Sequence, residues 1–314
     1  MSFPGAPAYA SLRSPLGGTP LPRHSCGAES RLPSPLSACG LCPRECGANR
    51  LAGERGFCGA GRQARVAAVS LHHGEEPPIS GTRGSGTVFF SHCNMKCLFC
   101  QNYPISQYGN GREMDAETLA GELLRLQEQG AHNVNFVTPT PHVPQLVEAV
   151  LLARGKGFAI PVVYNTNGYD SLGTLALLDG VVDIYLPDAK YASRGLAREA
   201  SGTPDYPERN AAAIAEMVRQ VGFLDAVEDG VASRGVLVRH LVLPGKVEET
   251  EAVLSRLAGA HGTELPLSLM GQYFPAWKAA SVPGYDRKPT RREYGRAIAA
   301  ARRLGFRNVF LQER

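Results

Sequence analysis

The stretch that decides the fold and most of the chemistry is His92-Cys93-Asn94-Met95-Lys96-Cys97-Leu98-Phe99-Cys100-Gln101-Asn102-Tyr103. Its cysteines have C-x3-C-x2-C spacing and follow the apolar run 87–90, which is typical of a buried strand. A structural zinc or an ordinary iron–sulfur cubane takes four protein ligands, so a cubane held by three thiolates keeps one iron open for an external ligand. The alternatives are a half-formed zinc site or three unrelated buried thiols.

The composition excludes several classes of protein. The chain has 314 residues, with 33 Lys plus Arg against 29 Asp plus Glu, and so small an excess argues against a nucleic-acid binder. No apolar run approaches the roughly 18 residues that span a bilayer, so we expect no membrane association. The N-terminus lacks the apolar core of a secretory signal. Eight cysteines, clustered at C-x2-C and C-x3-C spacings, favour metal ligation over disulfides and therefore a reducing cytoplasm.

The N-terminal segment 1–38 is rich in Pro, Gly and Ser, which predicts a poorly ordered tail. Its acid-poor, Arg-containing start also resembles an organelle transit peptide, but no amphipathic helix supports that interpretation. Cys26 stands alone in this tail and is interpreted as incidental rather than as a ligand.

A cysteine knuckle follows at 39–64, with its thiols at Cys39, Cys42, Cys46 and Cys58. The segment is too short to build a core of its own, so a bound metal would be what folds it. Four thiolates suit zinc or an auxiliary iron–sulfur cluster, and the sequence does not choose between them. The alternative is four reduced, buried cysteines without metal.

Residues 65–314 alternate short apolar runs with amphipathic helices, the pattern of a parallel α/β fold. The predicted strands are 87–91, 134–137, 162–165, 182–186, 236–242, 267–270 and 308–311. Among the helices, one begins after Asp115, one carries the apolar stripe 143–151, and one begins at the capping box Thr290 to Glu293 and ends near Gly305. Six β/α units predict an incomplete (β/α)6 TIM-type barrel that is open at one side.

Polar residues and glycines follow the predicted strands, at the edge where parallel α/β folds bind ligands. Each motif alone is weak, because Thr-Asn-Gly is commonly a turn and Asp-x-Lys is commonly a surface pair. Their shared placement at the strand ends favours a ligand-binding site. The motifs are 138–142, 166–169, 187–190, 239–245 and 270–273.

With these motifs the chain resembles the radical S-adenosylmethionine (SAM) superfamily, in its glycyl-radical-activating branch typified by pyruvate formate-lyase activating enzyme. The resemblance runs over 86–274. Asn165-Thr166-Asn167-Gly168 is similar to that branch's Asp-Thr-Asn-Gly, Asp188-Ala189-Lys190 to its Asp-x-Lys, and 239–245 to its Arg-x-Val-Val-x-Pro-Gly. Thr138-Pro139-Thr140 replaces its Gly-Gly-Glu, and the knuckle precedes the triplet, whereas that branch carries additional clusters after it.

The resemblance implies a [4Fe–4S] cluster on Cys93, Cys97 and Cys100 whose open iron binds the amino and carboxylate groups of SAM. Reductive cleavage would then give methionine and a 5′-deoxyadenosyl radical that abstracts hydrogen. Phe99 would pack near the adenine. The remaining expected SAM contacts are Thr138, Thr140, Asn167, Asp188, Lys190 and Arg239. His72, His73 and His142 have weaker claims, since a lone histidine is more often structural.

Three functions remain in competition at this point. The first is hydrogen abstraction from a glycine of a partner enzyme, with flavodoxin or ferredoxin as electron donor. The second is the same radical chemistry on a small molecule or another peptide. The third is a non-enzymatic metal-binding scaffold, which the intact triplet and the polar strand ends argue against.

Overall fold

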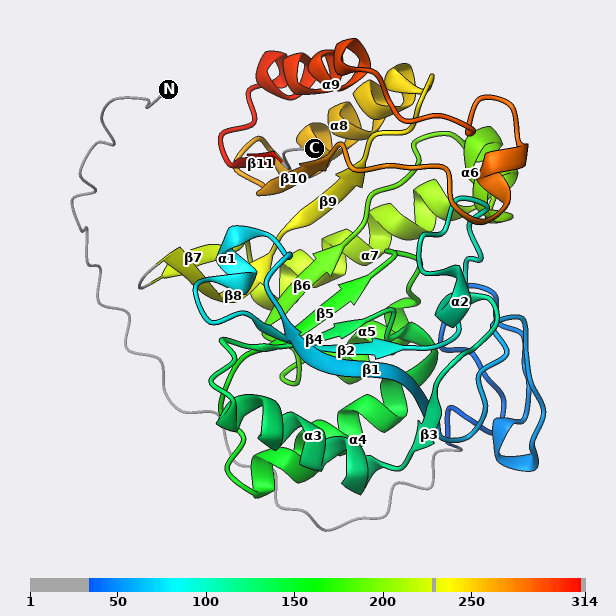
Figure 1. The fold of residues 1–314 in the computed structure, drawn as a ribbon, viewed down its shortest axis with the longest axis vertical. Helices are drawn as coiled ribbons and strands as arrows, with labels where there is room; N and C mark the ends of the chain where they lie inside the picture. Colours follow the sequence, from blue (N-terminus) through cyan, green and yellow to red (C-terminus); the bar gives the residue numbers. More distant parts are fainter. Residues whose placement is uncertain (1–33, 228–229, 312–314) are drawn as a thin grey trace. The chain divides into compact units, whose positions relative to one another are not determined.

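The computed structural model describes residues 34–227 and 230–311 (Figure 1). Most of the predicted tail, including Cys26, lies outside the described residues. The part of it that is described, 34–38, forms a turn in which Leu36 is buried against the knuckle residues Cys39, Leu41 and Ala48. The described residues therefore begin ahead of the knuckle's first cysteine.

The structure alternates strands and helices in chain order. The strands are β1 (Ala64–His72), β2 (Ser85–Phe90), β3 (Arg112–Met114), β4 (Val134–Val137), β5 (Val162–Thr166), β6 (Ile184–Pro187), β7 (Asp225–Val227), β8 (Val231–Val236), β9 (Val238–Leu241), β10 (Leu267–Met270) and β11 (Val309–Leu311). The helices are α1 (Pro77–Ser80), α2 (Tyr103–Ser106), α3 (Ala116–Glu128), α4 (Val143–Gly155), α5 (Leu172–Leu178), α6 (Arg194–Ser201), α7 (Tyr206–Val221), α8 (Val247–His261) and α9 (Arg291–Leu304), with short 3-10 turns η1 (Arg50–Ala52), η2 (Thr140–His142) and η4 (Trp277–Ser281).

Within the described residues, one sheet has the order β3-β1-β2-β4-β5-β6-β8-β7 and a second has the order β11-β10-β9 (Figure 1). The pairs from β2 through β8 are parallel, as are both pairs of the second sheet. Helices pack on one another in the order of the strands, α3 on α4, α4 on α5 and α5 on α7. The strands between them are buried on both faces, as a parallel sheet covered by crossover helices requires. The α/β fold expected from the sequence is confirmed.

The predicted strand 236–242 differs from the structure, because the chain leaves one sheet and enters the other at Leu237. β8 pairs with β6, whereas β9 pairs with β10, and a single parallel bridge between Asp188 and Arg239 continues across the break. Gly235, just before the break, has φ +119°, and a Cβ there would lie 2.3 Å from the carbonyl oxygen of Phe223. The bend requires glycine, which an apolar pattern does not reveal.

The sequence pattern also missed strands β1, β3 and β7, all of which pair antiparallel to their neighbours. β1 pairs with β2 at the edge where a closed barrel would continue, and β1 itself is half-exposed. Its far end leads to His72 and Glu75, which reach the cavity described below. These strands owe their pairing to distant partners, so local periodicity does not specify them.

The predicted helix boundaries are confirmed by their caps. Asp115 accepts a hydrogen bond from the backbone of Thr118 at the start of α3, and Pro144 lies in the first turn of α4. Thr290 and Glu293 form the reciprocal capping box of α9, which ends at Gly305 with φ +88°. Among the helices that the structure describes, none is long and apolar enough to cross a membrane.

We expect Thr290→Ala to lower the free energy of unfolding by about 1 kcal/mol, because the hydroxyl that caps the backbone of Glu293 is lost. Thr290→Ser keeps that hydroxyl and serves as the matched control. Chemical denaturation followed by circular dichroism measures both variants. An alanine variant as stable as the serine variant would contradict the capping role.

Candidate functional site

The cysteine triplet lies on the loop that follows β2, where two other elements hold it. The backbone N–H of Leu98 donates to the carbonyl of Ala200 at the end of α6 (2.9 Å), and its carbonyl accepts from Lys278 and Ala279 of η4 (3.1 Å each). Cys93 and Cys97 are buried, and Cys100 is half-buried. All three are free thiols. The sequence therefore folds this segment into a loop clamped between α6 and η4.

Each thiol of the triplet has a polar side chain beside its sulfur. The Asn167 amide lies 3.5 Å from Cys93 Sγ, and the Ser106 hydroxyl lies 3.1 Å from Cys100 Sγ. The Ser201 hydroxyl donates to Cys97 Sγ at 2.9 Å. Sequence reasoning did not select either serine; Ser106 lies only six positions from Cys100, whereas Ser201 reaches the triplet across 104 positions and nothing local marks it.

Burial opposes ionisation of these thiols. It raises the pKa of Cys97 to about 12 and also raises that of Cys100. Thiolates at this depth need cations beside them, and bound metal supplies the charge while the protons are released.

The triplet supplies three thiols, one fewer than a structural zinc ion takes. In the part of the chain that the structure describes, no three His, Cys, Asp or Glu side chains come close enough together to hold a single ion. A cubane places each thiolate on a different iron, so its ligands lie farther apart than those of one ion. Three buried free thiols on a clamped loop fit a cluster of that kind.

A cavity of about 450 Å³ opens beside the triplet. It brings Cys97, Phe99 and Cys100 together with side chains from the ends of β4, β5, β6, β9 and β10, which all meet at this rim. The polar and charged residues among them are His72, Glu75, Gln101, Asn102, Asn165, Asp188, Lys190, Arg239 and Gln272. Of the rim motifs expected from the sequence, 187–190, 239–245 and 270–273 contribute residues to this cavity, which lies next to two of the three cysteines, whereas 138–142 and 166–169 contribute none.

Three charged groups pair at the centre of this wall. Asp188 accepts from Lys190 Nζ at 2.5 Å and from the Arg239 guanidinium at 3.2 Å. Burial would raise the pKa of Asp188, but the charges of Lys190 and Arg239 outweigh it and hold that pKa below its usual value. Burial likewise opposes the charge of Lys190, but Asp188 raises its pKa. All three groups are therefore charged at neutral pH.

Two further residues flank the charged group. Arg239 donates to Asn165 Oδ1 at 2.8 Å and lies 3.4 Å from Glu75. Burial raises the pKa of Glu75, although Arg239 opposes the shift. Sequence reasoning did not select Glu75, whose position in this site depends on the antiparallel strand β1.

Helix α7 fixes the two loops that carry Asn167 and Asp188. The Tyr206 hydroxyl lies 2.9 Å from the Asn167 carbonyl and 2.8 Å from the Asp188 carbonyl. The Asn210 amide donates to the carbonyls of Gly168 and Asp188 at 3.0 and 2.9 Å. Gly168 has φ +74°, and a Cβ on it would lie 2.3 Å from the Asp188 carbonyl oxygen, so only glycine fits this turn.

Phe99 lies where the sequence predicts an aromatic wall. Its ring is buried, lines the cavity and packs 5.7 Å from the ring of Tyr273 and parallel to that of Tyr285 at 6.4 Å.

Thr138 and Thr140 do not line the cavity. The Thr140 hydroxyl donates to buried Asp170 at 2.8 Å, in a cluster that Tyr164 and Thr166 complete. Thr138 adopts φ +58°, a left-handed conformation that β-branched residues rarely occupy. Thr138 therefore has a backbone conformation that glycine adopts more readily.

The histidines divide between cavity and core. His72 lines the cavity, whereas His73 is exposed outside it. His142 is buried with its ring nitrogen 2.9 Å from the Ser91 carbonyl, and burial lowers its pKa to about 3. His142 is therefore a neutral structural residue.

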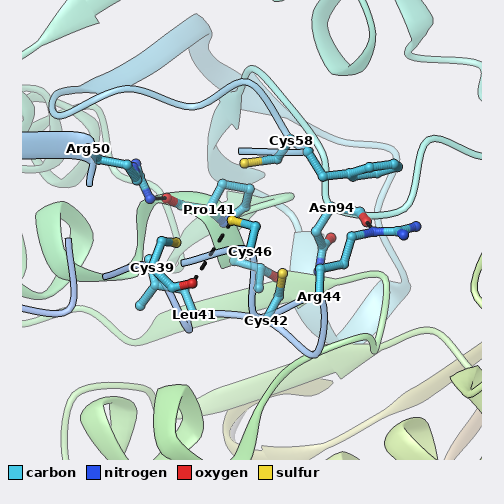
Figure 2. A pocket seen from close by; sticks show the side chains of 11 residues that line it. Cys39, Leu41, Cys42, Arg44, Cys46, Arg50, Cys58, Asn94 and Pro141 are labelled. Atoms are coloured by element: carbon cyan, nitrogen blue, oxygen red, sulfur yellow. Dashed lines mark hydrogen bonds between the residues drawn. The ribbon is translucent and has the colours of Figure 1, made fainter. Parts of the chain in front are cut away.

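The four cysteines of the knuckle surround a second, much smaller cavity (Figure 2). Asn94 of the triplet loop also lines it, so this residue is in contact with both cysteine sets.

The family model that matches the sequence is that of the radical SAM superfamily, over residues 87–257, more than half of the chain. Two proteins of Methanocaldococcus jannaschii are similar over most of their length. The uncharacterized protein MJ0674 is 29% identical over 280 residues, which are 87% of this chain and 76% of that protein. The uncharacterized protein MJ0808 is 25% identical over 265 residues, which are 78% and 73% of the two chains.

Among solved structures, the FeFe-hydrogenase maturase HydG from Carboxydothermus hydrogenoformans superposes with a TM-score of 0.52 at 14% identity, covering 73% of this chain and 53% of that one. At this identity the likeness shows the fold alone. The chain spans about half the length of such proteins, including 46% of Streptococcus suis SuiB.

We expect Ser201→Ala to make the reduction potential of a cluster at the triplet more negative, because the hydroxyl that donates to Cys97 stabilises added negative charge. The shift should reach up to roughly 60 mV, the equivalent of a tenfold change for one electron. Redox titration followed by EPR measures it, with iron content unchanged. Ser255→Ala, an exposed serine of α8, is the matched control. Equal potentials in both variants would contradict the role of this hydrogen bond.

Proposed function

Because this chain belongs to the radical SAM superfamily, we propose that it binds SAM in the 450 Å³ cavity beside the triplet and uses it to abstract a hydrogen atom from a glycine of a partner enzyme. The observation that carries the proposal is that one cavity joins the Cys97 and Cys100 thiols to the charged group of Asp188, Lys190 and Arg239. When bound, cluster and SAM together supply one-electron cleavage of the C5′–S bond, which gives methionine and a radical able to attack an unreactive C–H bond.

The triplet supplies the ligands for a [4Fe–4S] cluster. Cys93, Cys97 and Cys100 each offer one thiol. They lie on the loop that follows β2 and is held by α6 and η4, and three ligands leave one iron for SAM. The hydrogen-bonding groups of Asn167, Ser201 and Ser106 would stabilise the negative charge on the three sulfurs.

The charged wall suits the methionine end of SAM. Lys190 and Arg239 place two cationic hydrogen-bond donors in the cavity wall, beside Asp188 and Glu75. The methionine carboxylate would accept a charge-assisted hydrogen bond from one of them.

The apolar wall suits the adenine. Phe99 packs against the rings of Tyr273 and Tyr285, so its orientation does not depend on the ligand. A rigid aromatic face in contact with the cavity stacks a planar base without the entropy loss of ordering a mobile side chain.

The cavity's size bears on the substrate. About 450 Å³ lies within the roughly 300–1,000 Å³ typical of a site for a single small ligand. The exposed residues Gln101, Asn102 and Gln272 mark its open side. A substrate that approaches there as a protein segment fits this shape, which favours a glycine loop of a partner, as in the activating branch that the motifs resemble.

We expect the anaerobically reconstituted chain to release 5′-deoxyadenosine from SAM in the presence of dithionite. Cys97→Ala should abolish both the product and the SAM-dependent EPR signal, because one cluster ligand is lost. Cys26→Ser is the matched cysteine control and should retain both. Product formation by Cys97→Ala would contradict the assignment of the triplet.

The partner is tested separately. Addition of a candidate glycyl-radical enzyme should give an EPR doublet on that protein and degradation at its glycine in air. If 5′-deoxyadenosine forms but no candidate acquires the radical, the glycine substrate is wrong while SAM cleavage stands.

Lys190→Ala should weaken SAM binding roughly tenfold to a hundredfold, since a charge-assisted hydrogen bond contributes about 1.5–3 kcal/mol. Asp188 keeps Arg239 as a partner, so the cavity wall should persist and the iron content should stay unchanged. Lys156→Ala removes an exposed lysine paired with Glu117 and is the matched control. Anaerobic equilibrium binding with iron counted in the same sample measures the effect. Equal affinities would mean that the carboxylate binds elsewhere.

A further inference from the structure

A surface beside the triplet carries several positive charges around an aromatic ring. It is formed by Arg44, Arg55 and Phe57 of the knuckle and by Lys96 of the triplet loop, and we call these four residues the cationic surface. Arg44 is half-buried, whereas the other three are exposed. Lys96 directly precedes Cys97, so the surface includes part of the loop that carries the triplet. None of the four residues lines the 450 Å³ cavity.

The Phe57 ring joins the two segments of this surface. The Arg44 guanidinium lies over the ring at 3.5 Å, and the Lys96 ammonium lies 4.9 Å from the ring centroid. Arg44 also donates to the Asn94 carbonyl at 2.6 Å (Figure 2). Contact with an aromatic face attracts a cation, so one ring holds both positive charges in place. The ring is itself 41% exposed, which leaves part of it free for another molecule.

Arg55 extends the surface toward His92, the residue before Cys93. Its guanidinium donates to the Gly59 carbonyl at 2.7 Å. A Cβ on Gly59 would lie 3.2 Å from His92 Nδ1, so the turn that Arg55 supports packs directly on His92. The cationic surface therefore adjoins Cys93, which is the cysteine of the triplet that does not line the cavity.

The contacts of these cations leave their charges unneutralised. Arg44 and Arg55 donate to carbonyls, and Lys96 contacts the ring. The knuckle contains four Arg and two Glu, an excess of two positive charges. Of its acids, Glu54 accepts from a backbone N–H of the same segment, and Glu45 is exposed. The surface is thus complementary to an anionic partner.

The chemistry proposed for the triplet states what such a partner would supply. Reductive cleavage of SAM consumes one electron per event, which a reductant outside the chain must deliver. SAM would occupy the cavity beside Cys97 and Cys100, so a reductant on the Cys93 side would not compete with it. Opposite charges speed the encounter of two proteins and orient them, and an exposed aromatic ring beside arginine is typical of interface centres.

We propose that the cationic surface docks a small acidic protein that carries a one-electron centre. The reduced carrier gives one electron to the cluster at the triplet and is itself oxidised by one electron, and no bond breaks in this step. The inference rests on the cluster proposed above. A nucleic acid and the partner enzyme that bears the glycine are the other anionic molecules that the test separates.

The test is the rate at which the oxidised cluster of the full, anaerobically reconstituted chain is reduced, followed by its visible absorbance in a stopped-flow instrument. An acidic flavodoxin in its reduced form is the carrier, and reduced methyl viologen is a small cationic reductant that needs no docking. Arg55→Glu with Lys96→Glu should slow reduction by flavodoxin at least about tenfold at low salt, because charge steering contributes roughly 10- to 1,000-fold to association. The difference should shrink above about 0.15 M salt, where the Debye length is about 8 Å. Reduction by methyl viologen should be unchanged.

The matched control is Arg291→Glu with Arg292→Glu, the same charge change at two exposed residues of α9. Arg55→Gln with Lys96→Gln removes the charges without reversing them and should give an intermediate rate. Circular dichroism and iron content establish that each variant is folded and loaded. Equal rates with flavodoxin in the two Glu variants would overturn the proposal. So would an equal slowing with methyl viologen, or a wild-type rate that does not depend on salt.

The readout does not require SAM, so the two proposals fail separately. A wild type that flavodoxin reduces in the expected way but that forms no 5′-deoxyadenosine would refute SAM cleavage and leave the docking surface standing. A chain that takes up no iron refutes both. If the Arg55/Lys96 charge reversal weakens binding to single-stranded DNA or to a candidate glycyl-radical enzyme while the rate of reduction is unchanged, the surface serves that partner and the proposed carrier is wrong.

Discussion

The buried contact of Asp188 with Lys190 and Arg239 is the constraint on which the cavity depends. It joins the end of β6 to β9 where the chain passes from one sheet to the other at Leu237. The Leu237 N–H donates to the Tyr185 carbonyl and the Ala189 N–H to the Arg239 carbonyl, so the ion pairs add to the backbone hydrogen bonds that align the strand ends. Removing one partner of a buried pair typically costs about 3–5 kcal/mol, because the remaining charge is left uncompensated. Arg239 therefore has a structural role, whatever ligand the cavity binds.

Helix α7, which does not line the cavity, holds two of the loops at its rim. Tyr206 and Asn210 of α7 hold the backbone on either side of the charged wall, and Gly168 permits the close approach. The side chain of Asn167 is directed at the triplet rather than at the charged wall, with its amide on Asn94 and Cys93. One short turn thus connects the two halves of the proposed SAM site.

The two cysteine sets share a support. Asn94 belongs to the triplet loop and lines the knuckle cavity, while Arg44 reaches from the knuckle to its carbonyl and to that of Gly202 behind α6. The knuckle segment therefore packs on the loop that carries the triplet, and loss of its structure would disturb that loop directly.

The sequence by itself determined the triplet, the parallel α/β pattern and the helix caps, because ligand spacing, apolar runs and capping side chains act over a few residues. It also identified Asp188, Lys190 and Arg239 as members of one rim, since parallel strands end at one edge. Only the tertiary structure decided the break at Leu237 and the position of strand β1, which arise from pairing between distant segments. It alone placed Ser201 on Cys97, because that hydrogen bond crosses a hundred residues and depends on how α6 packs.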